Sequence, residues 1–266
     1  MRRLDNSKRI VIKIGTSSLT KDDGKLNFNK IDELSKIICE LFAKGKEILL
    51  VSSGAISAGV EKLNLSERPS EIATKQAVAC VGQNALMQAY NIAFNKYNLN
   101  IGQMLLSKYV FDHEQFLNNA KNCIRTLWNL NCVPIINEND SITVDELKMG
   151  DNDNLSYCVA QMVDADLLII LSDIDGVYDC NPKTNNNAKI ICTIQQNDEI
   201  LNKIQKSSSN KFGTGGIETK IKSGLNCANN GIDAVIININ NLMNINRILN
   251  NEEIGTYFPS ATKKQQ

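Results

Sequence analysis

Short apolar runs alternate with segments of helical periodicity along most of the chain, and this alternation limits the folds open to it. The apolar runs are predicted to be buried strands, at residues 9–14, 47–51, 101–106, 133–136, 165–171, 234–237 and 256–258. Apolar residues recur at helical spacing between them, predicting helices over 29–44, 112–130, 198–204 and about 217–230, and one or two helices over 72–97, broken near Gly82 and Gln83. We therefore predict an α/β fold, a three-layer sandwich whose mostly parallel central sheet is covered by helices on both faces.

The densest polar stretch, NENDSITVDELKMGDNDNLS at residues 137–156, directly follows the predicted strand 133–136. In open α/β sheets, ligands bind beyond the carboxyl ends of strands, so Asn137, Asn139 and Asp140 are well placed. Residues 141–147 are expected to form a small arm, and an Asn or Asp after it would cap the next helix. A capped surface helix behind a polar turn is the alternative. Two clusters of acids and amides around one short arm favour a small-molecule site instead.

Small residues follow two predicted strands and would let a phosphate approach the backbone. Lys13 ends an apolar strand, where a buried ammonium is costly unless an anion meets it, and Gly15 follows at once. Ser53 and Gly54 hold the equivalent place after the strand 47–51. Two such strand exits make a phosphate cradle without a P-loop. The alternative is a plain strand exit with a lysine that reaches solvent.

A third glycine-bearing loop, FGTGGIETK at residues 212–220, opens the last long helix. Amides at a helix start, with Lys220 one turn in, can hold a polyphosphate. The alternative for this stretch is a disordered loop followed by a helix. Ser172 and Asp173 follow the strand 165–171, where they suit a nucleotide, although a simple turn is the alternative. Two lysines, glycine-bearing loops and one pocket of acids and amides indicate phosphoryl transfer, which depends on positioning and on neutralising charge.

Composition argues against several other classes of protein. Lys+Arg and Asp+Glu both number 29, so the balanced charge does not indicate a nucleic acid or an anionic membrane as partner. No apolar run reaches the ~18 residues of a membrane span, and a cytosolic protein is expected. The 8 cysteines form no C-x-x-C pair and are expected to be reduced and buried, without disulfides or metal. His113 is the only histidine, expected to cap a helix or lie at the surface, which argues against a Ser-His-Asp hydrolase.

The chain resembles the amino acid kinase family along almost its whole length. The matching stretches are VIKIGTSSLT, VSSGAISAG, KQAVACVGQNALMQ, GQMLLS, VPIINEND, KMGDNDNLSYCVA, LLSDIDGVYDCNP and GTGGIETK. KQ...VGQ, NEND and MGDNDNLS look specific to the branch of the family that phosphorylates free glutamate. The resemblance implies a single domain over residues 1–266, with a glutamate-binding half at about 1–165 and a nucleotide-binding half at about 166–260.

The resemblance also implies the reaction and the residues that serve it. The reaction is ATP-dependent phosphorylation of the side-chain carboxylate of L-glutamate to L-glutamyl 5-phosphate, the first step of proline synthesis, with Mg²⁺ held mainly by the ATP phosphates. The implied catalytic residues are Lys13 and Lys220, which stabilise the transition state, and Asp153, which orients them. The implied substrate-binding residues are Ser53, Gly54, Ala55, Asn137, Asp140, Asp151 and Asn152. The implied ATP-binding residues are Lys13, Gly15, Ser172, Asp173, Thr214, Gly215, Gly216, Ile217, Glu218, Thr219 and Lys220.

Two alternatives keep the fold but change the function. Kinases of acetylglutamate, aspartate, uridylate or carbamate would share the architecture, but NEND and MGDNDN argue against them. Asp140 would pair with a free α-ammonium and so discriminate against an N-acylated substrate. A catalytically silent metabolite-binding regulator is the other alternative, and the presence of Lys13, Lys220 and Asp153 argues against it.

The resemblance carries expectations about partners as well. Many bacterial members have a C-terminal domain of the PUA type, and plant and animal versions are fused to a reductase; this chain is expected to lack both. The acyl phosphate product is labile, so a separate glutamyl phosphate reductase is expected. Feedback inhibition by L-proline and a homo-oligomer, either dimer or tetramer, are further properties that the family implies.

Overall fold

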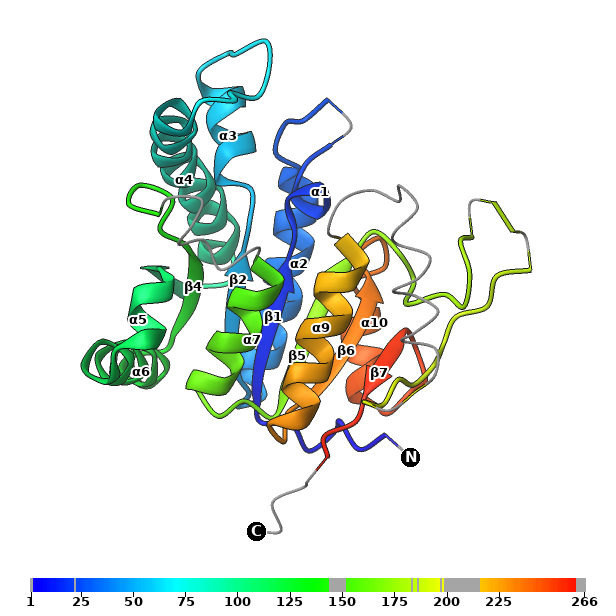
Figure 1. The fold of residues 1–266 in the computed structure, drawn as a ribbon. Helices are drawn as coiled ribbons and strands as arrows, with labels where there is room; N and C mark the ends of the chain where they lie inside the picture. Colours follow the sequence, from blue (N-terminus) through cyan, green and yellow to red (C-terminus); the bar gives the residue numbers. More distant parts are fainter. Residues whose placement is uncertain are drawn as a thin grey trace.

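A computed structural model describes residues 2–21, 23–143, 152–182, 184–185, 187–196, 198 and 216–261. One seven-stranded sheet crosses the molecule in the order β3-β4-β2-β1-β5-β6-β7 (Figure 1). Its strands are β1 (Arg9–Ile14), β2 (Glu47–Ser52), β3 (Asn100–Leu106), β4 (Cys132–Glu138), β5 (Leu167–Ser172), β6 (Asp233–Asn238) and β7 (Thr256–Phe258). Every neighbouring pair is parallel except β6 and β7. The predicted mostly parallel sheet is confirmed.

Helices cover both faces of this sheet, as predicted. They are α1 (Thr16–Leu19), α2 (Phe28–Ala43), α3 (Ala55–Lys62), α4 (Ile72–Asn95), α5 (Lys108–Asp112), α6 (Glu114–Asn129), α7 (Asn152–Met162), α9 (Gly216–Asn229) and α10 (Asn244–Leu249). In Figure 1, α7 and α9 lie in front of β1 and β5, and α2 lies behind them. None of the helices in the described ranges is long and apolar enough to cross a membrane.

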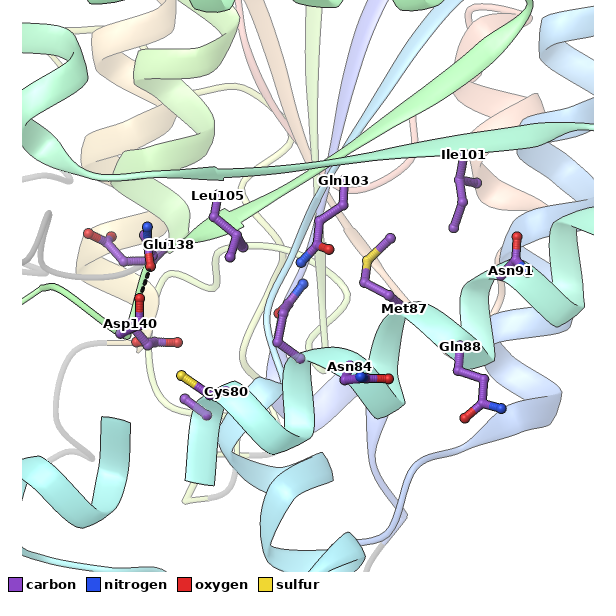
Figure 2. Close-up of a pocket in the computed structure, with 14 residues that line it drawn as sticks. Cys80, Asn84, Met87, Gln88, Asn91, Ile101, Gln103, Leu105, Glu138 and Asp140 are labelled. Carbon is purple, nitrogen blue, oxygen red and sulfur yellow. Dashed lines mark hydrogen bonds between the residues drawn. The ribbon is translucent and has the colours of Figure 1, made fainter. Parts of the chain in front are cut away.

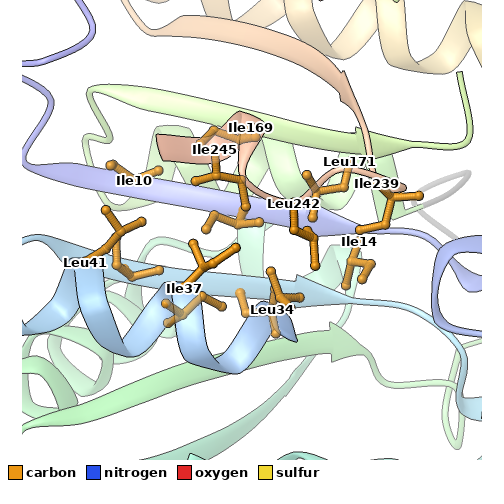
Figure 3. Packing of buried hydrophobic residues seen from close by; sticks show 14 of the residues in the cluster. Ile10, Ile14, Leu34, Ile37, Leu41, Ile169, Leu171, Ile239, Leu242 and Ile245 are labelled. Atoms are coloured by element: carbon orange, nitrogen blue, oxygen red, sulfur yellow. The ribbon is translucent and has the colours of Figure 1, made fainter. Parts of the chain in front are cut away.

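Each face of the sheet has its own apolar core, because successive strand residues point to opposite faces. On β1, Ile10, Ile12 and Ile14 join the core beneath α2, whereas Val11 joins the core beneath α7 and α9. The first of these cores is drawn in Figure 3 with Ile10, Ile14, Leu34, Ile37, Leu41, Ile169, Leu171, Ile239, Leu242 and Ile245 labelled. By the same alternation, Lys13 points toward the face covered by α7 and α9.

The predicted break near Gly82 is wrong, since α4 is one continuous helix of 24 residues. A Cβ atom built on Gly82 would lie 1.8 Å from the carbonyl oxygen of Ala55 and 2.3 Å from the amide nitrogen of Gly59. Gly82 therefore serves the close crossing of α3 and α4 rather than a turn.

The predicted helix 112–130 is in fact two helices, α5 and α6, divided at His113. His113 has extended backbone angles, φ −128° and ψ 113°, which interrupt the helical path. Its Nδ1 lies 2.8 Å from the carbonyl oxygen of Tyr109, and its exposed ring stacks on the Tyr109 ring. The predicted surface role is confirmed, while the side chain makes no capping hydrogen bond.

The cysteines are less buried than predicted. All eight are free thiols, but only Cys227 is buried, and Cys80, Cys123, Cys180 and Cys192 are exposed. Cys80 and Cys123 lie on the solvent sides of α4 and α6, so helical periodicity assigned them to the wrong face. Trp128 belongs to the core, because it is 8% exposed and its Nε1 donates to the carbonyl oxygen of Ile48 at 2.9 Å.

Two predicted elements fall largely outside the described residues. They are the arm at 141–147 beyond residue 143 and the helix 198–204 beyond residue 198.

The crossing of α3 and α4 gives a stability test. We expect Gly82→Ala to lower the free energy of unfolding by about 1–3 kcal/mol, because the new methyl group overlaps the backbone of α3. Urea unfolding measures the change. Gly216→Ala is the matched control, since a Cβ atom added there meets none of the described residues beyond its chain neighbours and its own helix backbone within 4 Å, and it should leave stability nearly unchanged. Equal stability of the two variants would contradict the close crossing.

Candidate active site

The strand register gathers polar residues at the carboxyl edge of the sheet. Ile14 pairs with Ser52 on β2 and with Leu171 on β5, and Val51 pairs with Ile136 on β4. The next residues along these strands, Gly15, Ser53, Ser172 and Asn137, therefore lie along one edge. Ligands of open α/β sheets bind at this edge.

A buried carboxylate, Asp153 in the first turn of α7, joins two lysines from distant parts of the chain. Its Oδ1 forms an ion pair with Lys13 Nζ at the end of β1. Its Oδ2 accepts from Lys220 Nζ on α9 at 2.9 Å and from Thr219 Oγ1 at 3.0 Å. Asp153 is 1% exposed and Lys13 is 4% exposed. The anion required by the buried Lys13 ammonium is thus supplied by Asp153.

The charge state of this cluster follows from two opposing effects. Burial alone would raise the pKa of Asp153, but the ammonium groups of Lys13 and Lys220 outweigh it, so the pKa lies below its ordinary value. Asp153 is consequently ionised at neutral pH. Together the three groups carry one more positive than negative charge, which favours an anion at this edge of the sheet.

A chain of amide hydrogen bonds adjoins the charged cluster. Asn152 Nδ2 donates to the carbonyl oxygen of Ser52, to Ser53 Oγ and to Asn137 Oδ1, at 2.8, 2.8 and 2.9 Å. Asn137 Nδ2 in turn donates to Gln83 Oε1 at 2.9 Å. The network fixes the start of α7 against β2, β4 and α4, and so fixes Asp153 next to Asn152.

A cavity of about 240 Å³ opens beside this network. It is lined by Thr16, Ser53, Gly54, Ala55, Ile56, Ser57, Arg68, Asn137, Glu138, Asp140 and Asn152. Drug-sized ligands occupy roughly 300–1,000 Å³, so this cavity suits a smaller molecule. The structure therefore brings six of the predicted substrate-binding residues together around one space, and the seventh, Asp151, lies outside the described residues.

The backbone conformation at the cavity wall explains why residue 54 is a glycine. Gly54 has φ +102°, in the left-handed region, and directly precedes α3. A side chain would strain this turn, whereas glycine lets the chain pass from β2 into α3 at the cavity wall. Gly15 lies close to the charged cluster, because a Cβ atom there would be 3.6 Å from Lys13 Nζ.

Of the predicted nucleotide-binding residues, Lys13 lies in β1 and Gly15 directly after it, and the other described ones lie on the far side of β1 from the cavity. Ser172 is buried at the end of β5 and donates to the exposed Asp173 at 3.2 Å. Gly216, Ile217, Glu218, Thr219 and Lys220 form the start of α9. Thr214 and Gly215 lie outside the described residues. Across the described ranges, no group of three or more His, Cys, Asp or Glu residues could hold a metal ion.

The structure adds residues that sequence reasoning missed. Gln83 is 8% exposed and orients Asn137; its stretch VGQ was noted only for its resemblance, because a glutamine on a helix carries no local signal. Thr16, Arg68 and Glu138 line the cavity but come from separate segments. Glu138 directly follows Asn137 in the NEND stretch, and this position was the sequence signal that could have identified it as a site residue.

A second, larger hollow of about 770 Å³ lies between α4 and β3. Figure 2 shows Asn84, Met87 and Asn91 on one side of it, facing Gln103 and Ile101 on the other. Gln83, Glu138 and Asp140 line it as well. Asn152, the neighbour of Asp153 in the charged cluster, lines the smaller cavity but not this hollow, so the smaller cavity is the better candidate for a substrate that reacts at Lys13 and Lys220.

The buried carboxylate predicts a pH-dependent contribution to stability. We expect Asp153→Asn to lower the free energy of unfolding by about 3–5 kcal/mol at pH 7, because the buried Lys13 ammonium and the partly buried Lys220 ammonium lose their counter-ion. Since folding lowers the pKa of Asp153, its stabilisation is complete above the ordinary pKa of 3.8 and disappears as the pH falls through the lower folded value. The deficit should therefore shrink below pH 3.8.

Urea unfolding of both proteins between pH 7 and pH 3 measures this deficit. Asp32→Asn is the control, since its partner Lys96 is largely exposed and its loss should hardly change stability. A deficit that grew on acidification would contradict the sign of the shift.

The amide network predicts a second effect. We expect Gln83→Leu to lower the free energy of unfolding by about 1–3 kcal/mol, because Asn137 Nδ2 would lose its acceptor in a buried place. Gln83→Glu keeps an acceptor and should lose less. Gln88→Leu, on the exposed side of the same helix, is the control in the same unfolding measurement. A Gln83→Leu protein as stable as this control would show that the hydrogen bond contributes nothing.

Comparison with known proteins places this site in a family. The model of the amino acid kinase family matches residues 8–238. A glutamate 5-kinase of Clostridium perfringens is 45% identical over 259 residues, which cover 96% of each chain. A glutamate 5-kinase of Streptococcus uberis is 46% identical over 97% of each chain.

Solved structures agree on the fold. An isopentenyl phosphate kinase, 18% identical, superposes with a TM-score of 0.65 over 94% of this chain and 99% of its own. With a family model matched over most of its length and relatives this similar over nearly all of it, the chain belongs to the amino acid kinase family.

Proposed function

We propose that this protein is a glutamate 5-kinase, which phosphorylates the side-chain carboxylate of L-glutamate with ATP as the first step of proline synthesis. The observation that carries the proposal is the Lys13–Asp153–Lys220 cluster, with Lys13 and Asp153 buried, beside the cavity that Ser53 and Asn152 line. The relatives named glutamate 5-kinase, similar over nearly the whole chain, support the same reaction.

The charged cluster suits phosphoryl transfer because that reaction depends on charge stabilisation and positioning. Lys13 and Lys220 reach the reaction centre from β1 and α9 and would neutralise charge on the transferring group. Asp153 holds both ammonium groups in place. The substrate carboxylate itself attacks phosphorus, and the bond to the leaving ADP oxygen breaks, so no side-chain nucleophile is required.

The small cavity suits the amino acid. Asp140 would accept from the α-ammonium of glutamate, a charge-assisted contact that an N-acylated substrate could not make. Ser53, Asn137 and Asn152, with the Gly54–Ala55 turn, would hold the remaining polar atoms. This contact favours free glutamate over N-acetylglutamate as the substrate.

The nucleotide would lie across β1 from this cavity. Gly15, Ser172, Asp173 and the start of α9 are the residues proposed to contact ATP, whose γ-phosphate is the group transferred. Mg²⁺ is proposed to bind through the phosphates. A glutamate-binding half at about residues 1–165 and a nucleotide-binding half at about 166–260 would thus meet at β1 and β5, where Lys220 contacts Asp153.

Further properties belong to the proposal as well. The labile acyl phosphate product requires a separate reductase that consumes it, and a cytosolic location would bring the two enzymes together. Inhibition by L-proline and assembly into a dimer or tetramer are proposed on the family resemblance. Sedimentation analysis with and without L-proline tests the assembly, and the kinase assay with added L-proline tests the inhibition.

The lysines provide the direct test of function. We expect Lys13→Ala and Lys220→Ala to lower kcat about 10²–10³-fold, because each removes a positive charge from the transition state. The assay supplies ATP, Mg²⁺ and L-glutamate and traps the acyl phosphate as its hydroxamate. Lys222→Ala, an exposed lysine on the same helix as Lys220, is the matched control and should keep full activity.

Different outcomes separate the alternatives. Full activity of Lys220→Ala would contradict the proposed role of the cluster. Phosphorylation of N-acetylglutamate in preference to glutamate would change the substrate. Tight binding of glutamate with no hydroxamate would indicate the silent regulator.

A further inference from the structure

The small cavity is lined by charges of both signs, and the proposed contact of Asp140 with the α-ammonium of glutamate uses only a negative one. Its lining includes two carboxylates, Glu138 and Asp140, and Arg68 is the one cationic side chain among the described residues that line it. The α-ammonium of glutamate would pair with one of these carboxylates, Asp140. The exposed Arg68 guanidinium is available to bind an anion in the cavity.

Glutamate supplies such an anion. Its side-chain carboxylate must reach the end of the cavity near Lys13 and Lys220, where Asn152 and Thr16 lie close to the charged cluster in sequence. Its α-ammonium and α-carboxylate then occupy the rest of the cavity. Asp140 is proposed to contact the α-ammonium, and Asn152 lies at the end where the side-chain carboxylate is expected. The α-carboxylate is then the one charged group of glutamate without a proposed partner of opposite charge.

Arg68 comes from a separate wall, the segment of residues 63–71 that connects α3 with α4 at the top of Figure 1. Its side chain is exposed and makes no hydrogen bond or ion pair with the described part of the chain. Pro69 follows it and restricts its backbone to extended conformations. The guanidinium group can therefore meet a carboxylate with two parallel hydrogen bonds without giving up an existing partner.

We propose that Arg68 binds the α-carboxylate of the amino acid substrate and thereby selects α-amino acids over simpler carboxylic acids. This inference rests on the proposed function. Arg68 would act on substrate affinity, while Lys13 and Lys220 act on the transferring phosphoryl group.

Lys75 is the competing cation, because it also lies near Asp140. It lines a separate hollow of only about 20 Å³, with Ile56, Ile72, Gln76 and Thr143. A space of that size has room for about one water molecule and not for a carboxylate. The cavity of about 240 Å³ that Arg68 lines has the room.

Two analogues of glutamate test the assignment. Glutarate lacks the amino group but keeps both carboxylates, and 4-aminobutyrate lacks only the α-carboxylate. We expect Arg68→Ala to raise KM for L-glutamate and the inhibition constant of glutarate about 10–100-fold, as the loss of a charged hydrogen bond implies. The inhibition constant of 4-aminobutyrate and kcat should stay unchanged. Asp140→Asn should give the opposite pattern, weakening 4-aminobutyrate and sparing glutarate.

Controls separate this role from a structural one. Arg68→Lys should recover part of the affinity, and Arg125→Ala, an exposed arginine on α6, should leave all constants unchanged. An Arg68→Ala protein that loses affinity for all three compounds alike, or for none, overturns the inference, as does the expected pattern in Lys75→Ala instead. A wild-type protein that forms no acyl phosphate from glutamate would refute the proposed function itself.

Discussion

The contact of Asp153 with two lysines is the interaction on which the site depends. Lys13 is almost completely buried in the central strand, so its ammonium requires a fixed anion. Asp153 provides it from α7, and its second oxygen holds Lys220 on α9. One carboxylate therefore connects β1, α7 and α9 and places two positive charges side by side at the carboxyl edge of the sheet.

The amide network extends this order to the proposed substrate cavity. Asn152 precedes Asp153 and hydrogen-bonds to β2 and to Asn137 on β4. Gln83 holds Asn137 from α4. A change in the cavity wall would consequently move the start of α7 and with it the carboxylate between the lysines. The same hydrogen-bond network therefore shapes the proposed substrate cavity and positions the two lysines.

Close packing of α3 against α4 supports the other side of the cavity. Gly82 and Gly59 allow the two helix backbones to approach within contact, and Gly54 permits the turn into α3. The connection between these helices carries Arg68 to the cavity. Small residues thus determine where a charged side chain reaches the site.

Local patterns in the sequence determined the strands, the long helices α2, α4 and α9, and the polar strand ends. Apolar runs such as residues 9–14 predict buried strands because short stretches of isoleucine and valine are stable where both faces of a sheet are covered. Patterns failed where long-range packing decided: Gly82 resembles a helix break but serves a crossing, and His113 divides a segment of helical periodicity. The ion pairs of Asp153 and the bond between Gln83 and Asn137 join residues that are far apart in the sequence. Only the tertiary structure could place these groups together, because no local property of one segment specifies a partner on another.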